Sequence, residues 1–174
     1  MHNTEDKHWW VIEWAKQEQQ FVAQVCPVLG LAATINPAKQ RDRYAPDIVV
    51  DGQVADLKCQ QTPFFKARVL YNLDPQYVVT FNRKDYLRYQ RLYPGITLYF
   101  WLDWQVRKML IGRAAFAVAP LAGVWRAPFA QLAALIEQRI APLHAYHRRH
   151  RDLQGNAKES YLVDVRGLEC LYQR

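Results

Sequence analysis

The first regular pattern of apolar positions lies near the start of the chain and predicts an amphipathic helix over residues 9–26, ended by Pro27. At about 100° per residue, one stripe of this helix carries the apolar residues Trp10, Val11, Trp14, Ala15, Phe21, Val22 and Val25. Glu18 falls near the middle of that stripe, whereas Glu13 falls on the other side. A carboxylate directed inward is costly unless a cation meets it. The pattern therefore predicts a metal ion or a basic group beside Glu18.

Two compact apolar runs predict a β-hairpin after a polar loop over residues 36–45. The runs cover residues 47–50 and 54–59, and Asp51-Gly52 separates them. An Asp-Gly pair between β-branched runs is typical of a two-residue hairpin turn. A short strand over residues 29–35 is expected to precede the loop.

Beyond the hairpin, the apolar pattern changes repeatedly between helical and extended periods. Helices are expected at residues 64–72, 84–93 and 128–149, the last kinked at Pro142, and strands at 76–81, 97–103, 108–114 and 161–165. This order predicts an α/β fold with a central mixed β-sheet flanked by helices. With 174 residues and no internal repeat, the chain fits one domain, 1–174, in which the helix after Pro128 is a peripheral addition.

Composition narrows the class of partner and the compartment. The formal net charge is +7, which favours a polyanionic partner. The three cysteines lie far apart and form no CxxC pair, which argues against a zinc ribbon or a disulfide framework and fits a reducing compartment. No apolar run has the length of a membrane span and the polar start is unlike a signal peptide, so we expect a cytoplasmic protein without a membrane partner.

The second strand of the predicted hairpin carries a row of polar side chains in an apolar setting. Because side chains alternate between faces, Asp56, Lys58 and Gln60 share one face of this strand. Folding back at Asp51-Gly52 brings Asp47 towards Asp56 and Lys58. Two converging carboxylates repel each other unless a cation lies between them. The pattern thus indicates a site for a divalent cation with an ammonium beside it, which are the parts needed to hydrolyse a phosphodiester.

These residues resemble the signature of the PD-(D/E)XK, or restriction-endonuclease-like, nuclease superfamily. Pro46-Asp47, the Asp-Gly turn and Asp56-Leu57-Lys58 match its motif, and the order of elements from residue 9 to 81 is similar to its common core. The resemblance covers roughly residues 9–103. It implies a restriction-endonuclease-like core, with residues 104–174 as an addition of helix and strands that resembles nothing identified.

The resemblance also implies a role for each site residue. Asp47 and Asp56 are expected to ligate Mg²⁺ or Mn²⁺, and Lys58 to position the attacking water. Glu18 is expected to help ligate the metal or orient its water shell, and Gln60 to support the site. The implied activity is hydrolysis of nucleic acid, DNA before RNA and as an endonuclease before an exonuclease. Many such nucleases act as dimers, so a homodimer is a further expectation.

Basic residues near the predicted site are candidates for contacts to phosphates. They are Lys39, Arg41, Arg43, Lys66 and Arg68. Three alternatives stay open: an RNA nuclease, a nuclease-like fold that binds nucleic acid without cutting it, and a structural protein in which Asp56 and Lys58 are only an ion pair. Gly-rich phosphate loops and GxSxG elbows are absent, and Cys59 lies on the apolar face of its strand, which disfavours nucleotide-driven motors and thiol or serine hydrolases.

Overall fold

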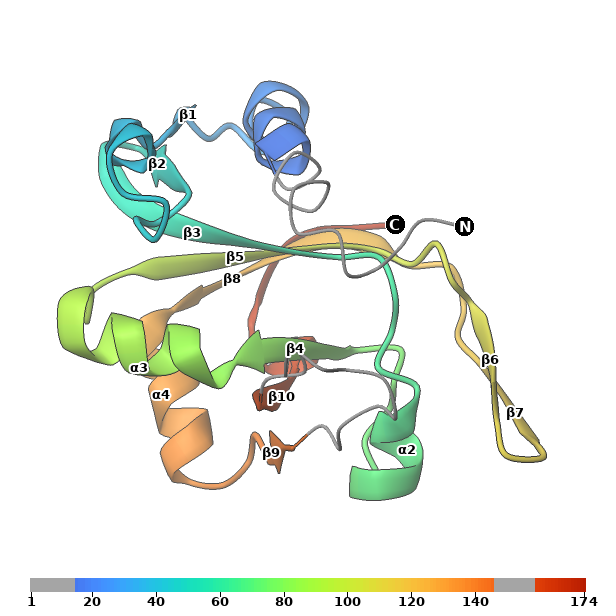
Figure 1. The fold of residues 1–174 in the computed structure, drawn as a ribbon. Helices are drawn as coiled ribbons and strands as arrows, with labels where there is room; N and C mark the ends of the chain where they lie inside the picture. The colour runs from blue at the N-terminus through green and yellow to red at the C-terminus, as the bar shows by residue number, and fades with distance from the viewer. Residues whose placement is uncertain (1–14, 146–158) are drawn as a thin grey trace. The chain divides into compact units, whose positions relative to one another are not determined.

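A computed structural model describes residues 15–145 and 159–174 of the chain, which form two compact units, residues 1–59 and 60–174. Helices and strands are mixed along both units, so the predicted α/β class is confirmed (Figure 1). Within the described ranges, no helix combines the length and the apolar character needed to cross a bilayer.

The N-terminal unit begins with the predicted helix. Residues 15–20 are α-helical, and the π-helical turn η1 (Phe21–Val25) continues them, closed by a hydrogen bond from Cys26 N to Phe21 O. Residues 9–14 of the expected helix lie outside the described residues. Phe21 is fully buried, as its stripe predicts, whereas Ala15 is exposed. The inward stripe is therefore confirmed at Phe21 but not at Ala15.

Three strands follow in the N-terminal unit as an antiparallel meander. They are β1 (Ala33–Ile35), β2 (Ile48–Val50) and β3 (Gln53–Gln60), with the short 3-10 helix η2 (Pro37–Gln40) between the first two. The turn between β2 and β3 is Asp51-Gly52, with φ of 50° and 78°, the left-handed values that a tight hairpin turn requires. Asp51 Oδ1 also accepts a hydrogen bond from Ala32 N at 3.0 Å. The predicted hairpin and its turn are confirmed.

The C-terminal unit contains the remaining elements. Its helices are α2 (Lys66–Tyr71), α3 (Arg83–Leu92), α4 (Phe129–Glu137) and the 3-10 helix η3 (Val165–Gly167). Its strands are β4 (Val78–Asn82), β5 (Thr97–Asp103), β6 (Lys108–Ile111), β7 (Ala114–Ala117), β8 (Ala122–Pro128), β9 (Leu143–His144), β10 (Ser160–Asp164) and β11 (Glu169–Gln173). Strand β8 pairs antiparallel with β5 and β11, and β10 pairs antiparallel with β4 and β9.

The larger apolar cluster of the C-terminal unit joins its strands to two of its helices. Sheet residues such as Phe100 and Trp125 are buried in the same cluster as Tyr89 of α3 and Leu132 of α4. Figure 1 shows α3 and α4 on one side of the paired strands β5 and β8. The expectation that the helix after Pro128 is a peripheral addition is wrong, because its apolar face completes this core.

The predicted long helix over residues 128–149 is also wrong, since α4 ends at Glu137. Arg139 adopts a left-handed φ of 60°, and Ile140 N and Ala141 N both donate to Leu135 O, which closes the last turn. The chain then turns back to form β9, in which His144 pairs with Ser160 of β10. Burial of Ala141 and His144 outweighs the helical propensity of the sequence. Residues 146–149 lie outside the described residues.

The expected strand over residues 108–114 is wrong as a single element, because the chain reverses at Gly112-Arg113. Strands β6 and β7 pair from Lys108↔Ala117 to Ile111↔Ala114. Gly112 has a φ of 61°, a conformation that glycine adopts without strain. The segment is thus a separate two-stranded hairpin.

Candidate active site

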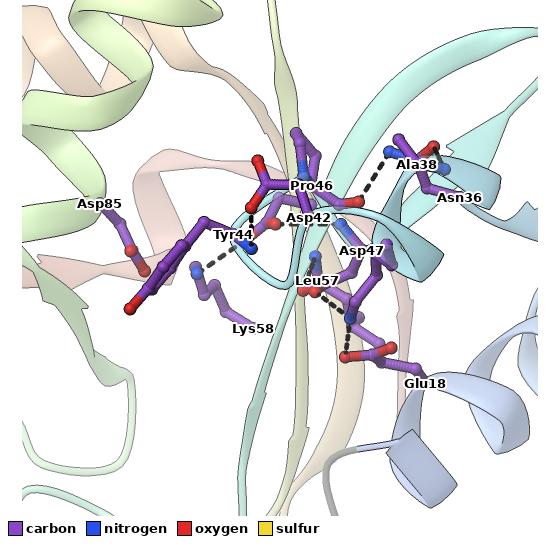
Figure 2. A network of polar contacts seen from close by, with 12 residues as sticks. Glu18, Asn36, Ala38, Asp42, Tyr44, Pro46, Asp47, Leu57, Lys58 and Asp85 are labelled. Carbon is purple, nitrogen blue, oxygen red and sulfur yellow. Dashed lines mark hydrogen bonds and ion pairs between the residues drawn. The ribbon is translucent and has the colours of Figure 1, made fainter. Parts of the chain in front are cut away.

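The hairpin of the N-terminal unit brings the two predicted aspartates together. The register pairs Ile48 with Ala55, so Asp47 lies beside Asp56 at the next position along the two strands. Asp47 N donates a hydrogen bond to Asp56 Oδ1 at 3.2 Å. Leu57 N donates to Asp47 Oδ2 at 3.3 Å, and Figure 2 shows Asp47 and Leu57 side by side. Asp56 is only 1% exposed. The backbone of each strand therefore holds the carboxylate that the other strand supplies.

Lys58 lies against Asp56, two residues away on the same strand. Its Nζ is 2.7 Å from Asp56 Oδ2, and the two side chains are 20% and 2% exposed. The contact follows from the two-residue period of a strand, which directs both side chains to one face. The predicted sharing of a face by Asp56 and Lys58 is confirmed, and the ammonium offsets the charge of a carboxylate that has little contact with water.

A second lysine joins the third carboxylate to the pair. Lys39 Nζ lies 2.5 Å from Glu18 Oε1 and 2.6 Å from Asp47 Oδ1. The Glu18 side chain is 14% exposed, so it is turned inward as its helical position predicts. We call Glu18, Asp47 and Asp56, with Lys39 and Lys58, the acidic cluster. Its members come from the first helix, η2, the start of the hairpin and β3.

The loop before the hairpin is ordered in a way that places Lys39. Asn36 begins η2 by accepting a hydrogen bond from Ala38 N at 3.1 Å, and its Nδ2 donates to Pro46 O at 2.8 Å. Its backbone N also donates to Asp47 O at 3.0 Å. Buried Asn36 thus fixes both ends of the loop, which positions Lys39 at Asp47.

Crowding of negative charge changes the protonation of the cluster. Burial, and then the carboxylates of Asp56 and Glu18, raise the pKa of Asp47 to about 7, although Lys58 and Lys39 act in the opposite direction. Burial acts to lower the pKa of Lys39, but Asp47 and Glu18 outweigh it and the net pKa is raised. Near neutral pH, Asp47 is therefore partly protonated while Lys39 stays charged.

The thiol on the same strand is a poor nucleophile. Burial, and then the charges of Asp47 and Glu18, raise the pKa of Cys59 to about 12. A thiol with this pKa is almost wholly protonated at neutral pH, and the thiolate is the reactive form. The position of Cys59 beside three carboxylates therefore disfavours thiol chemistry.

Within the described residues, no group of three or more His, Cys, Asp or Glu side chains converges closely enough to hold a metal ion. Lys39 Nζ takes the place between Glu18 and Asp47 that a shared cation would need. The chemistry of the donors still fits a hard divalent ion, because such ions prefer carboxylate oxygens and tolerate several water ligands.

The other predicted site residues have different surroundings. Gln60 is the first residue of the C-terminal unit, where its Nε2 donates to Thr80 O at 2.8 Å and to Thr80 Oγ1 at 3.1 Å, so its amide binds β4. Arg41 and Arg43 are exposed on the loop after η2, and Arg43 lies over the Tyr44 ring. Lys66 and Arg68 are exposed on α2.

Lys39 is the residue whose place the sequence did not predict. The sequence placed it among the phosphate contacts, whereas the structure pairs it with Glu18 and Asp47. The sequence contained one signal for this contact, namely that the inward carboxylate of Glu18 needs a cation, but it did not indicate which residue supplies the cation.

No protein-family model, curated protein or solved structure matched this chain.

Proposed function

We propose that this protein is a metal-dependent nuclease that hydrolyses phosphodiester bonds, DNA before RNA, with a restriction-endonuclease-like core. The observation that carries the proposal is the contact between Asp47 and Asp56 across the β2–β3 hairpin. Lys58 forms an ion pair with Asp56, and Lys39 forms ion pairs with both Asp47 and Glu18. Three carboxylates and two ammonium groups in one small volume are costly to assemble. Such an arrangement is typical of a catalytic centre more than of a stabilising one.

Each residue then has a distinct part. Asp47 and Asp56 would hold Mg²⁺ or Mn²⁺, and Glu18 would supply a third carboxylate in place of its present pairing with Lys39. A bound ion of this kind supplies a more acidic water and neutralises charge on the phosphate. Lys58 is held 2.7 Å from Asp56, where its ammonium orients the attacking water and stabilises developing negative charge. Lys58 itself ligates nothing, because an ammonium has no lone pair to give.

Calorimetric titration with Mn²⁺ tests the site directly. We expect the parent to bind Mn²⁺, and Asp47→Asn and Asp56→Asn each to weaken binding by more than about tenfold, because each removes a carboxylate ligand. Asp42→Asn is the matched control, since Asp42 is exposed in the same unit and its carboxylate accepts a turn hydrogen bond from Tyr44 N at 2.8 Å, which the amide oxygen of Asn can also accept. Equal weakening by the control variant would remove the support for a shared site, and folded parent protein that binds no Mn²⁺ would contradict the proposal.

A nucleic-acid-binding protein without turnover is the second candidate, and the place of Lys39 favours it. Two ion pairs of 2.5 and 2.6 Å satisfy Glu18 and Asp47 without any metal. Incubation of the parent with supercoiled and linear DNA in Mn²⁺ separates the two candidates. If the parent cuts DNA and Asp56→Asn abolishes the cutting, the result supports the nuclease. If the parent binds DNA without cutting it and Asp56→Asn binds equally well, the result supports the second candidate.

A further inference from the structure

The β6–β7 hairpin of the C-terminal unit has one fully exposed face, whereas Ile111 and Phe116 on the other face are partly buried. Cross-strand pairing puts Lys108 and Leu110 on one face with Ala117 and Ala115, and all four are exposed. Leu110 is 75% exposed. Figure 1 shows the two strands extending away from the other elements of this unit. A two-stranded ribbon that packs against few other residues is marginally stable by itself. Contact with a binding partner would stabilise it.

Charge on this hairpin is of one sign. Residues 104–136 contain no Asp or Glu. Arg107, Lys108 and Arg113 are exposed, and their side chains form no ion pair with any residue that the structure describes. By contrast, Arg126 and Arg166 of the same unit pair with Glu169 and Asp164 at 2.7 and 2.5 Å. The hairpin therefore presents unneutralised positive charge to a partner.

Shape complements this charge. The alanines opposite Lys108 and Leu110 leave that face low, so a partner can approach the ribbon backbone closely. At the base of the hairpin, an open hollow of about 470 Å³ is lined by Arg107, Arg174 and Asp103, and the Asp103 carboxylate accepts a hydrogen bond from Gln105 Nε2 at 2.7 Å. The base thus continues the positive surface of the strands.

We propose that the β6–β7 hairpin binds duplex DNA, lying in the major groove with Leu110 against the bases and Arg107, Lys108 and Arg113 at the flanking phosphates. The major groove of B-form DNA admits a two-stranded ribbon, whereas the major groove of duplex RNA is too deep and narrow for side chains to read. The choice of nucleic acid over other polyanions rests on the proposed function. The hairpin then favours duplex DNA as the substrate of the nuclease.

Fluorescence anisotropy with a labelled 20-base-pair DNA, in EDTA so that no cutting occurs, tests this inference. The probe variant is Arg107→Gln/Lys108→Gln/Arg113→Gln. The matched control is Arg83→Gln/Arg126→Gln/Arg166→Gln, which removes the same charge from arginines already paired with Glu159, Glu169 and Asp164. We expect the probe variant to lose roughly 10–100-fold in affinity and about 2–3 from the slope of log K against log salt, at about 0.9 per phosphate contact. The control should change both quantities much less.

A second variant, Leu110→Ser, separates groove insertion from simple charge attraction. We expect weaker duplex binding with an unchanged salt slope, because no phosphate contact is removed. Equal losses in the probe and control variants, preference for duplex RNA, or binding to anionic phospholipid vesicles in place of DNA would each overturn the inference. The proposed nuclease is judged separately by the Mn²⁺ titration, since the hairpin variants keep the acidic cluster intact. If the parent cuts DNA but the probe variant binds DNA as tightly as the parent, the role of the hairpin is contradicted and the proposed nuclease is not.

Discussion

In the acidic cluster, cations and carboxylates lie 2.5 to 2.7 Å apart on side chains that are mostly buried, whereas the cations of the β6–β7 hairpin are exposed and face no acid of the described chain. Buried pairs are weakly screened, so they fix geometry and shift pKa values. Exposed charges are screened by salt and act through attraction at a distance. On the two proposals made above, the same residue types would serve catalysis in the acidic cluster and binding of DNA on the β6–β7 hairpin.

The largest effect is expected for Lys58→Met, which should lower the rate of cutting by roughly 10²–10³-fold, the usual cost of losing one charge-stabilising group. Mn²⁺ affinity should stay within a few-fold of the parent, because Lys58 is no ligand. Single-turnover cleavage and calorimetry measure the two quantities. Arg113→Gln should show the reverse of this split, with weaker DNA binding and an unchanged single-turnover rate at saturating enzyme. Loss of Mn²⁺ binding in Lys58→Met would contradict the assigned role.

Protonation of Asp47 should make the stability of the metal-free protein depend on pH. Its pKa rises from 3.8 to about 7 on folding, so between these values the folded state holds more protons than the unfolded state. The free energy of unfolding should therefore fall as pH rises from about 4 to 7, by on the order of a few kcal/mol. Urea unfolding across this range measures it. Asp47→Asn should flatten the dependence of unfolding free energy on pH, whereas the Arg107→Gln/Lys108→Gln/Arg113→Gln probe variant should leave it unchanged. If Asp47→Asn keeps the dependence of the parent, another group causes the effect.

A smaller effect is expected for Lys39→Met, which removes the ammonium that competes with a metal ion for Glu18 and Asp47. Mn²⁺ affinity should rise by about tenfold, equivalent to roughly 1.4 kcal/mol. Lys39→Arg keeps the charge and is the matched control. Weaker binding in Lys39→Met would show that the lysine supports the metal site instead of competing with it.

The smallest effects are expected at the two turns. Gly52 and Gly112 have φ of 78° and 61°, and a Cβ at either position meets no atom within 4 Å. Alanine at each should cost about 1 kcal/mol through backbone strain alone. Gly52→Ala should reduce cutting, since it loosens the hairpin that joins Asp47 to Asp56, and Gly112→Ala should reduce only DNA affinity. Cleavage assays and anisotropy measure both properties in both variants. Equal losses of cutting and of DNA affinity in the two variants would contradict separate roles for the acidic cluster and the β6–β7 hairpin.

The sequence predicted what depends on neighbouring residues. The Asp51-Gly52 turn sets the register of β2 and β3, and this register alone brings Asp47 to Asp56. The two-residue period of β3 likewise determines the contact of Lys58 with Asp56. These parts of the fold and the site are local and need no tertiary information.

What the sequence could not predict depends on contacts between distant residues. Lys39 and Glu18 are 21 positions apart, and their contact needs the loop that Asn36 holds in place. Strand β11 is paired with β8 across 43 positions at Arg126 and Glu169, and neither strand was expected. The end of α4 at Glu137 likewise reflects burial of Ala141 and His144 farther along the chain, which outweighs a continuous helical pattern.

The pairing of buried Asp56 with Lys58 also constrains how this chain can change in evolution. Replacement of either residue alone leaves the other charge uncompensated in a site that is almost closed to water, at a cost of about 3–5 kcal/mol. Replacement of both by apolar residues is far less damaging. On the proposed function, a descendant that loses catalysis is therefore expected to lose the two residues together. Homologues with a lone Asp56 or a lone Lys58 should be rare, and an apolar pair at these positions would identify the inactive lineages.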